Sequence, residues 1–510
     1  MRFKFEKITK VLASRRFFWA ILFVFIFESI WFALSAAYPQ AFDENFHFGL
    51  IQVYSHYWLP FLSSQPPHAN AYGAVARDPS YLYHYLMSFP YRLIALFVHG
   101  QTGQVILLRF INIGLFTLNL VLLRKILRKV GISLALSNVI LAVFILIPVV
   151  PDLASQINYD NLLILCVAWV ALLTFRVIDD LRKRKPSLKN LMSLIIVSTF
   201  ASLVKYEFLP IFLGVVLFLL FISFKLYKKH PKSLLSGLWT SWKTQSMVVR
   251  VMMVSLLLIS LGMFIQRDGI NLIRYHSIAP NCSKVLSIND CKVYSVWNDN
   301  YQWHNELLNG TVHVSFENPI TYAGSWLYWM MYRSFFAVNG PSSGFTNYPP
   351  LPLPIAAAIL LAFFAMFTLV RFRKKIFYKN PYLTLLSFIS CLYLISLMAE
   401  GYIYYRYTGV LELMNGRYLL PIILFLAAIG GIGISISMRH FPARKAVVAV
   451  MVLILFLQGG GILTFIERSD STWYWSNNEV VRVNNIAKRI TKPVIVKGSK
   501  TYDTQDWLFN

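Results

Sequence analysis

Long apolar segments recur along the whole chain, and they constrain its fold more than any other feature. Windows of about 20 residues with at most one charge have the length that a helix needs to cross a bilayer core. Of the 510 residues, 57% are hydrophobic and only 14% are charged, which is atypical of soluble globular domains. We therefore predict an all-α polytopic membrane protein. The eleven predicted spans are roughly 17–38, 103–123, 132–150, 159–178, 188–204, 208–224, 247–265, 351–370, 382–402, 418–438 and 446–466.

Basic residues gather on one side of this predicted topology. With the N-terminus placed inside, the inner segments hold 30 of the 48 Lys and Arg residues but only three acids. The outer segments are assigned the other 18 bases and 18 acids, and the first span holds Glu28. This asymmetry follows the positive-inside rule and sets the excess charge against anionic membrane lipids. Topology thus explains the net charge of +26, and we expect no nucleic-acid partner.

The same orientation places the C-terminus outside and makes 39–102 and 266–350 the longest outer segments. Long ordered loops are usually functional. Tyr and Phe recur at helical spacing on both sides of a turn in 39–102, which predicts two interfacial helices, the second interrupted by Pro90. Residues 1–466 form the predicted transmembrane domain, and 467–510 form a short outer tail too small for its own core.

Two of the four cysteines, Cys282 and Cys291, lie nine positions apart in the larger outer segment. Outside the cytosol such a pair can form a disulfide. No CxxC spacing or neighbouring His pattern supports a zinc pair. The sequence alone leaves the disulfide open.

Ionisable residues near the predicted outer boundary fall in a few short turns. Asp43 and Glu44 follow the first span in "FDENFHF", and Asp160 begins the fourth in "NYDN". Lys205 lies between the fifth and sixth spans in "VKYEFLP", and Arg417 opens the tenth in "NGRYLLP". An ionisable side chain at that depth is costly unless it faces a cavity or a partner.

A set of acids and bases at this depth suits transfer of a group from a lipid-linked phosphate. A carboxylate can accept the proton of an attacking hydroxyl or amine. Basic side chains can hold a phosphate, Arg in bidentate geometry. A phosphate carried by a lipid would lie at the same depth, so we expect Asp43 to act as the base and Glu44 to support it.

Several of these acidic residues also have a structural interpretation. Asp43 and Asp160 could each cap a helix, and Glu44 could be a first-turn acid favoured by the helix dipole. His47 is four residues after Asp43 and shares its helix face. It could orient the carboxylate, bind a metal, or do neither.

The two basic residues also have a structural interpretation, and the sequence leaves metal binding open. Arg417 and Lys205 could be ordinary anchors that reach from helix ends to the interface. If a divalent metal is bound, Asp43, Asp160 and His47 are the candidate ligands.

In their order along the chain, these motifs resemble those of the GT-C superfamily of membrane glycosyltransferases. "FDENFHF" is similar to the Pro-Asp-Glu-x-x-His-Phe signature of a largely uncharacterised bacterial branch, with Phe42 in place of the proline. "NYDNLL" is similar to that branch's Asn-Pro-Asp turn, with Tyr159 replacing the proline, and "NGRYLLP" to its Gly-Arg-Tyr segment. "LVKYEFLP" resembles its Lys-containing turn. The order and topology match over at least residues 1–440, and the two missing prolines concern local turn geometry.

The resemblance implies an inverting glycosyltransferase that takes a sugar from a polyprenyl-phosphate donor and acts outside the cytoplasm. It implies Asp43 as the general base. Asp160 would be the second acid, which often helps to bind a metal or to position the acceptor. Arg417 and Lys205 would hold the donor phosphate.

We therefore expect a hexosyl- or pentosyltransferase in the plasma (inner) membrane, with its active site facing outside. The sugar and the glycan, lipid or protein acceptor are not identified by the sequence. One rival is a polysaccharide polymerase or ligase of related fold, which would use an outer Arg/His pair on the later loop. Another is a transporter, which would gather charged groups at the bilayer midplane between broken helices. In this sequence the charged groups lie at one membrane boundary instead, and no paired broken helices stand out.

Overall fold

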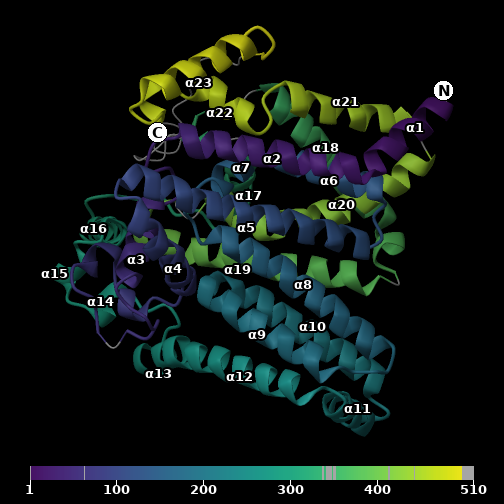
Figure 1. The fold of residues 1–510 in the computed structure, drawn as a ribbon, viewed down its shortest axis with the longest axis horizontal. Coiled ribbons are helices and arrows are strands. Elements are labelled where there is room, and N and C mark those ends of the chain that lie inside the picture. The colour runs from purple at the N-terminus through teal and green to yellow at the C-terminus, as the bar shows by residue number, and fades with distance from the viewer. Residues whose placement is uncertain are drawn as a thin grey trace.

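Long helices that run side by side make up most of the chain in the computed structural model (Figure 1). The structure describes residues 2–62, 64–335, 338–339, 347–348, 352–378, 380–411, 414–440 and 443–496. The helices of the bundle are α2 (Arg15–Ser35), α5 (Gln101–Lys129), α6 (Leu134–Ile145), α8 (Asp160–Arg182), α9 (Leu188–Val204), α10 (Leu209–Tyr227), α12 (Met247–Phe264), α18 (Pro352–Phe377), α19 (Pro381–Thr408), α20 (Leu420–His440) and α21 (Ala443–Leu457).

Shorter elements connect or flank these helices. They are α1 (Arg2–Ala13), α3 (Glu44–Tyr54), α4 (Leu82–Phe97), α7 (Val149–Ala154), α11 (Pro231–Lys243), α13 (Ile270–Tyr275), α14 (Cys282–Val285), α15 (Ile288–Cys291), α16 (Ser295–Leu308), α17 (Pro319–Phe335), α22 (Ile462–Arg468) and α23 (Asn478–Thr491). Single turns are η1 (Ala69–Tyr72), η2 (Val75–Arg77), η3 (Tyr206–Phe208), η4 (Ile265–Gly269), η5 (Gly416–Leu419) and η6 (Ser471–Trp473). The strands β1 (Val338–Asn339) and β2 (Asn347–Tyr348) pair antiparallel, with Val338 opposite Tyr348.

The predicted all-α membrane architecture is confirmed. In the described part of the chain, eight helices are long and apolar enough to cross a membrane, and the bent pair α21–α22 would make a ninth span. Two other predicted spans coincide with the shorter apolar helices α6 and α9. Each of the eleven predicted segments therefore contains a helix, and the number that cross a membrane stays a prediction.

The two ends of the bundle differ. The small helices α3, α4 and α14–α16 gather at one end, which we call the loop end, whereas the chain begins at the opposite end (Figure 1). The C-terminal helix α23 packs on the loop-end terminus of α2. Asn484 of α23 donates to Ser35 Oγ at 3.0 Å and accepts from Trp31 Nε1 at 2.9 Å. The described C-terminal segment and the N-terminus thus lie at opposite ends, as an odd number of crossings requires.

The first outer segment contains the two predicted helices, α3 and α4. The interruption predicted at Pro90 is wrong, because α4 continues through that residue. The apolar residues of α4 that are exposed are Leu86, Phe89, Leu93, Leu96 and Phe97. Such an apolar face favours a helix that lies in the membrane interface.

The segment after α12 holds the first outer segment in place. Arg267, in the π-helical turn η4, is fully buried and donates to the carbonyls of Val75 at 3.0 Å and Asp78 at 2.9 Å. Farther along, Cys282 and Cys291 are joined by a disulfide, with their Cα atoms 5.9 Å apart. The disulfide that the sequence left open is therefore present.

Candidate functional site

The chain leaves α2 through a turn with unusual backbone geometry. Phe42 and Asp43 both adopt left-handed conformations, with φ of 67° and 65°. Positive φ is uncommon for residues other than glycine and costs conformational energy in a bulky residue such as Phe. Two distant side chains hold the Phe42 carbonyl, with Arg417 Nη1 at 2.6 Å and Asn158 Nδ2 at 3.0 Å. A proline, whose φ is fixed near −65°, does not fit position 42 of this turn.

Asp43 carries the exposed carboxylate of the site. It precedes α3 at the N-cap position, but its side chain accepts no capping hydrogen bond, so the interpretation as a cap is wrong. Its Oδ2 instead accepts from Arg417 Nη2 at 2.8 Å, and the side chain remains 56% exposed. A carboxylate held on one side and open on the other can take a proton from an approaching acceptor.

A chain of ion pairs runs inward from Asp43. Arg417 Nε lies 3.7 Å from Asp160 Oδ2, and Lys205 Nζ donates to Asp160 Oδ1 at 3.0 Å. Lys205 Nζ also lies 3.0 Å from Glu207 Oε2. The buried charges stabilise one another, because an unpaired charge in this environment would be costly. The structure thus brings together Asp43, Asp160, Lys205 and Arg417, which lie in separate turns of the sequence.

The charge balance of this chain limits what its bases can bind. Three carboxylates, those of Asp43, Asp160 and Glu207, face only two bases. Burial alone would lower the pKa of Lys205, but Asp160 and Glu207 raise it well above its usual range, so the amine stays charged. Both bases are engaged, so a phosphate that binds here would compete with the carboxylates for them.

Tyr159 shapes the turn before α8. Its φ of −64° is one that proline also adopts, so the backbone at position 159 would accept a proline as well. Tyr159, rather than Asp160, occupies the N-cap position, so Asp160 does not cap α8. The Tyr159 ring lies 4.5 Å from the His47 ring and 4.6 Å from Lys205 Nζ. The aromatic ring thus separates the ion pairs from the buried histidine.

Glu44 points away from Asp43 into a second, fully buried ion pair. Both of its oxygens accept from Arg109 of α5, at 2.8 Å from Nε and 2.7 Å from Nη2. Glu44 also accepts from the backbone nitrogen of Ile157 at 3.1 Å. Arg109 Nη1 donates to the carbonyls of Ala33 and Ala36 at the end of α2. Through these contacts, Glu44 and Arg109 link the start of α3 to α5, to the end of α2 and to the turn at Ile157.

Arg109 was missed by the sequence analysis. The charge count assigns it to the outer segments, but it lies within α5 and is fully buried. Its signal in the sequence is a single base inside the apolar run "VILLRFINIGLF". A base at such a position faces a partner rather than lipid.

His47 pairs with a second histidine rather than with Asp43. Its Nδ1 lies 2.9 Å from His84 Nε2, and both side chains are buried. Burial lowers the pKa of His84 to about 3, and burial together with His84 lowers that of His47 well below its usual range. Both imidazoles are therefore neutral at physiological pH. Between described residues, no hydrogen bond joins the His47 ring to the Asp43 carboxylate.

The three candidate metal ligands do not converge. Among the described residues, no group of three His, Cys, Asp or Glu side chains is placed to hold a metal ion. Asp43 and Asp160 are paired with bases, and a cation at their oxygens would lie beside Arg417 and Lys205. The residues therefore do not fit a metal in this arrangement, and the reaction proposed below includes no metal-dependent step.

Comparison with known proteins yields weak likenesses only. No family model and no curated protein matches the chain. An archaeal oligosaccharyltransferase, AglB from Archaeoglobus fulgidus, in complex with an inhibitory peptide and a dolichol-phosphate, matches 96% of this chain at 11% identity and a TM-score of 0.45. The apo form of an oligosaccharyltransferase from that organism gives 12% identity and a TM-score of 0.42. The chain covers 57–58% of the length of these proteins. Likeness at this level assigns neither a family nor an activity.

Proposed function

We propose that the chain is an inverting glycosyltransferase that uses a polyprenyl-phosphate-linked sugar. It would transfer a hexose or pentose to a glycan, lipid or protein of the cell envelope at the outer face of the plasma (inner) membrane. The observation that carries this proposal is the exposed carboxylate of Asp43, held by the buried guanidinium of Arg417. A second acid, Asp160, lies against the same guanidinium.

The location of the ion pairs supports a lipid-linked donor. Asp160 begins α8, Lys205 follows α9, and Arg417 lies in η5 just before α20. All three therefore sit at the ends of apolar helices, where we expect a bilayer to meet water. The phosphate of a polyprenyl donor would lie at that depth with its isoprenoid chain in the lipid.

In the proposed reaction, Asp43 is the general base. Its carboxylate takes the proton of the acceptor hydroxyl or amine while that atom forms a bond to the anomeric carbon of the donor sugar. The bond between that carbon and the phosphate oxygen breaks, its electron pair stays on the oxygen, and polyprenyl phosphate leaves. Attack from the face opposite the leaving group inverts the anomeric configuration.

Arg417 is the first candidate to bind the donor phosphate. Its Nη1 can remain on the Phe42 carbonyl while Nη2 exchanges the Asp43 carboxylate for a phosphate oxygen. That exchange would free the Asp43 carboxylate to accept the proton of the acceptor. Lys205 is the second candidate, and there a phosphate would compete with Asp160 and Glu207.

Asp43→Asn tests the assignment of the base. We expect sugar transfer to fall by about 100-fold or more, because a general base contributes ~10²–10⁴-fold. Lipid-linked sugars and envelope glycans should be compared in cells that carry wild type, Asp43→Asn or no protein. Asn45→Ala, at an exposed neighbouring position, is the matched control and should keep full activity. Full transfer by a normally folded Asp43→Asn protein would show that Asp43 is not the base.

Arg417→Lys and Arg417→Ala separate the charge of the guanidinium from its geometry. We expect Arg417→Ala to abolish transfer, and Arg417→Lys to retain some activity with a raised KM for the lipid-linked donor, since Lys binds phosphate without the bidentate fork. Thermal unfolding of both variants in detergent shows whether the Phe42 turn has been lost. Unchanged transfer by Arg417→Ala would remove this residue from the phosphate site.

A further inference from the structure

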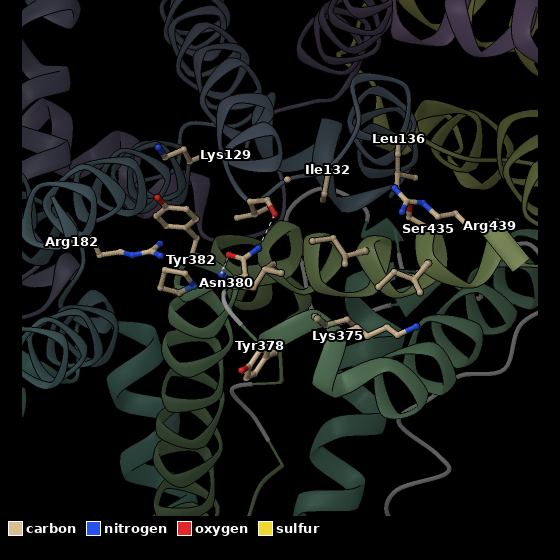
Figure 2. Close-up of a pocket in the computed structure, with 17 residues that line it drawn as sticks. Lys129, Ile132, Leu136, Arg182, Lys375, Tyr378, Asn380, Tyr382, Ser435 and Arg439 are labelled. Carbon is tan, nitrogen blue, oxygen red and sulfur yellow. Dashed lines mark hydrogen bonds between the residues drawn. The ribbon is translucent and has the colours of Figure 1, made fainter. Parts of the chain in front are cut away.

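A polar cavity lies at the end of the bundle opposite the loop end. Its volume is about 470 Å³, and it is lined by the ends of five helices, α5, α8, α18, α19 and α20, together with α6 (Figure 2). Four bases line it, and each comes from a different helix: Lys129, Arg182, Lys375 and Arg439. None of them belongs to the site around Asp43.

Three of these bases make no ion pair with a described residue. Lys129 is paired with Asp179 at 2.6 Å, whereas Arg182, Lys375 and Arg439 are exposed and have no carboxylate partner in the described part of the chain. In Figure 2, Lys129 and Arg182 lie on one side of the cavity and Arg439 on the other. Such an arrangement offers several cations to one anionic group placed between them.

The rest of the lining is divided between polar and apolar groups. Asn380, Tyr382 and Ser435 contribute polar side chains. The apolar lining residues include Ile132, Leu136, Leu383, Ile432 and Ile436. A free inorganic phosphate would use only the polar half of this surface. A phospholipid would place its phosphate among the bases and its glycerol and first methylenes against the apolar side chains.

We propose that this cavity binds the phosphate-bearing headgroup of an anionic phospholipid from the inner leaflet. Basic pockets between membrane helices on the cytoplasmic side are suited to such headgroups. A neighbouring cavity of about 430 Å³ is lined by Arg124, Lys125 and Arg128. Lys129 lines both this cavity and the one with Arg182 and Arg439. The basic surface thus continues around the end of α5. The proposal does not depend on the glycosyltransferase activity.

The bases have a competing explanation in the helix dipoles. Lys129 and Arg182 end α5 and α8, and Lys375 and Arg439 lie near the ends of α18 and α20. Cations stabilise helix C-termini without any ligand. A useful control must therefore remove bases that occupy the same helix ends but do not line the cavity. Lys183 and Lys185 directly follow α8, and Lys374 lies in the last turn of α18; all three are exposed and none belongs to the lining.

The experiment compares two triple variants of the full chain in nanodiscs. The cavity variant is Arg182→Ala/Lys375→Ala/Arg439→Ala, and the control is Lys183→Ala/Lys185→Ala/Lys374→Ala. Each is reconstituted in phosphatidylcholine with a minor fraction of phosphatidylglycerol, and retained lipid is measured by native mass spectrometry. We expect the cavity variant to bind phosphatidylglycerol about ten- to a hundredfold more weakly, from the contribution of each base near an anionic lipid, whereas the control binds as wild type does.

Thermal unfolding and competition by inorganic phosphate accompany the lipid-binding measurement. Thermal unfolding shows whether the cavity variant folds. If the triple variant does not fold, the single variant Lys375→Gln, at an exposed position, replaces it in the lipid-binding measurement. Equal phosphatidylglycerol retention by the wild type and the cavity variants, or an equal loss in the control, would overturn the proposal. Displacement of phosphatidylglycerol by inorganic phosphate at matched concentration would show that the cavity takes free phosphate instead of a lipid.

Discussion

At the residue scale, the two adjacent acids after α2 have opposite environments. Asp43 is largely exposed and has one Arg partner, whereas Glu44 is fully buried and accepts from both Arg109 and the backbone. An exposed carboxylate can exchange partners during a reaction. A buried one with bidentate partners cannot leave them without a large cost. The asymmetry supports the role proposed for Asp43 and gives Glu44 a structural one.

Loss of Arg109 should destabilise the folded protein strongly. Arg109→Ala leaves the Glu44 carboxylate buried without a counter-charge, which typically costs about 3–5 kcal/mol. Lys129→Ala breaks a partly exposed ion pair on the same helix, with Asp179, and should cost about 1 kcal/mol or less. Thermal unfolding in detergent measures both. A similar loss of stability in the two variants would contradict the structural role of the Glu44–Arg109 pair.

The buried histidine pair should make stability depend on pH in acid. The folded-state pKa of His84 is about 3, and that of His47 is also depressed, by burial, His84, Arg417 and Lys205. Below about pH 6.5 the unfolded chain binds protons that the folded chain does not. The free energy of unfolding should therefore fall as the pH drops from about 6.5 toward 3, by up to ~1.4 kcal/mol per pH unit for each histidine.

Two variants test the origin of this pH dependence. His84→Gln should make the fall in unfolding temperature between neutral and acidic pH shallower, because one of the two histidines no longer titrates. His56→Gln, at an exposed position on the same segment, should leave the slope unchanged. A slope in His84→Gln equal to that of wild type would show that other groups cause the acid sensitivity.

At the element scale, the break between α21 and α22 packs closely against α2. The helices α21 and α22 meet at 45° across Gly459–Gly461. Glu28, in the middle of α2, is buried against this break and accepts a hydrogen bond from the backbone of Ile462. Gly461 has φ of +61°, and a Cβ there would clash with the Glu28 carboxyl. The bend therefore depends on glycine.

Gly461→Ala should destabilise the protein by about 1–3 kcal/mol, because the substitution combines a strained backbone with the clash at Glu28. Gly114→Ala is the matched control, since Gly114 lies in α5 with open space around it and alanine is the better helix former. Unfolding temperatures of the two purified variants should shift in opposite directions, or at least differ clearly. Equal temperatures would mean that the bend tolerates a side chain.

At the scale of the whole molecule, the two ends of the bundle carry different charges and different sites. The end with Lys129, Arg182 and Arg439 is basic, as the positive-inside rule requires of a cytoplasmic face. The loop end carries Asp43 and the ion pairs of the candidate site. The charge distribution therefore supports the prediction that the loop end faces outside the cytoplasm.

Accessibility of introduced cysteines tests this orientation. In a Cys391→Ser background, Asn309→Cys and Asn478→Cys should react with a membrane-impermeant maleimide in intact cells. Ser236→Cys, in α11, should react only after the cells are permeabilised. All three positions are exposed in the structure. Labelling of Ser236→Cys in intact cells, or protection of Asn478→Cys, would contradict the predicted topology.

The helical membrane architecture and the positions of the long helices could be predicted from the sequence, as could four residues that the structure brings together, Asp43, Asp160, Lys205 and Arg417. Apolar run length and charge asymmetry are local properties, and they predict helices because a bilayer accepts little else. Local patterns alone led us to expect that Glu44 supports Asp43 and that Pro90 interrupts α4, and they did not point to Arg109.

The partner of each charged side chain depends on how distant helices pack, and so it could not be predicted from the sequence. Arg417 reaches Asp43 across 374 positions, and Arg109 reaches Glu44 across 65. Such pairs depend on which helices pack together, and no periodicity in one segment reports that. The tertiary structure also gave Phe42 its left-handed conformation, through the two side chains that hold its carbonyl. The strain of that turn is balanced by contacts made far away in the chain, and for that reason it could not be predicted from the turn itself.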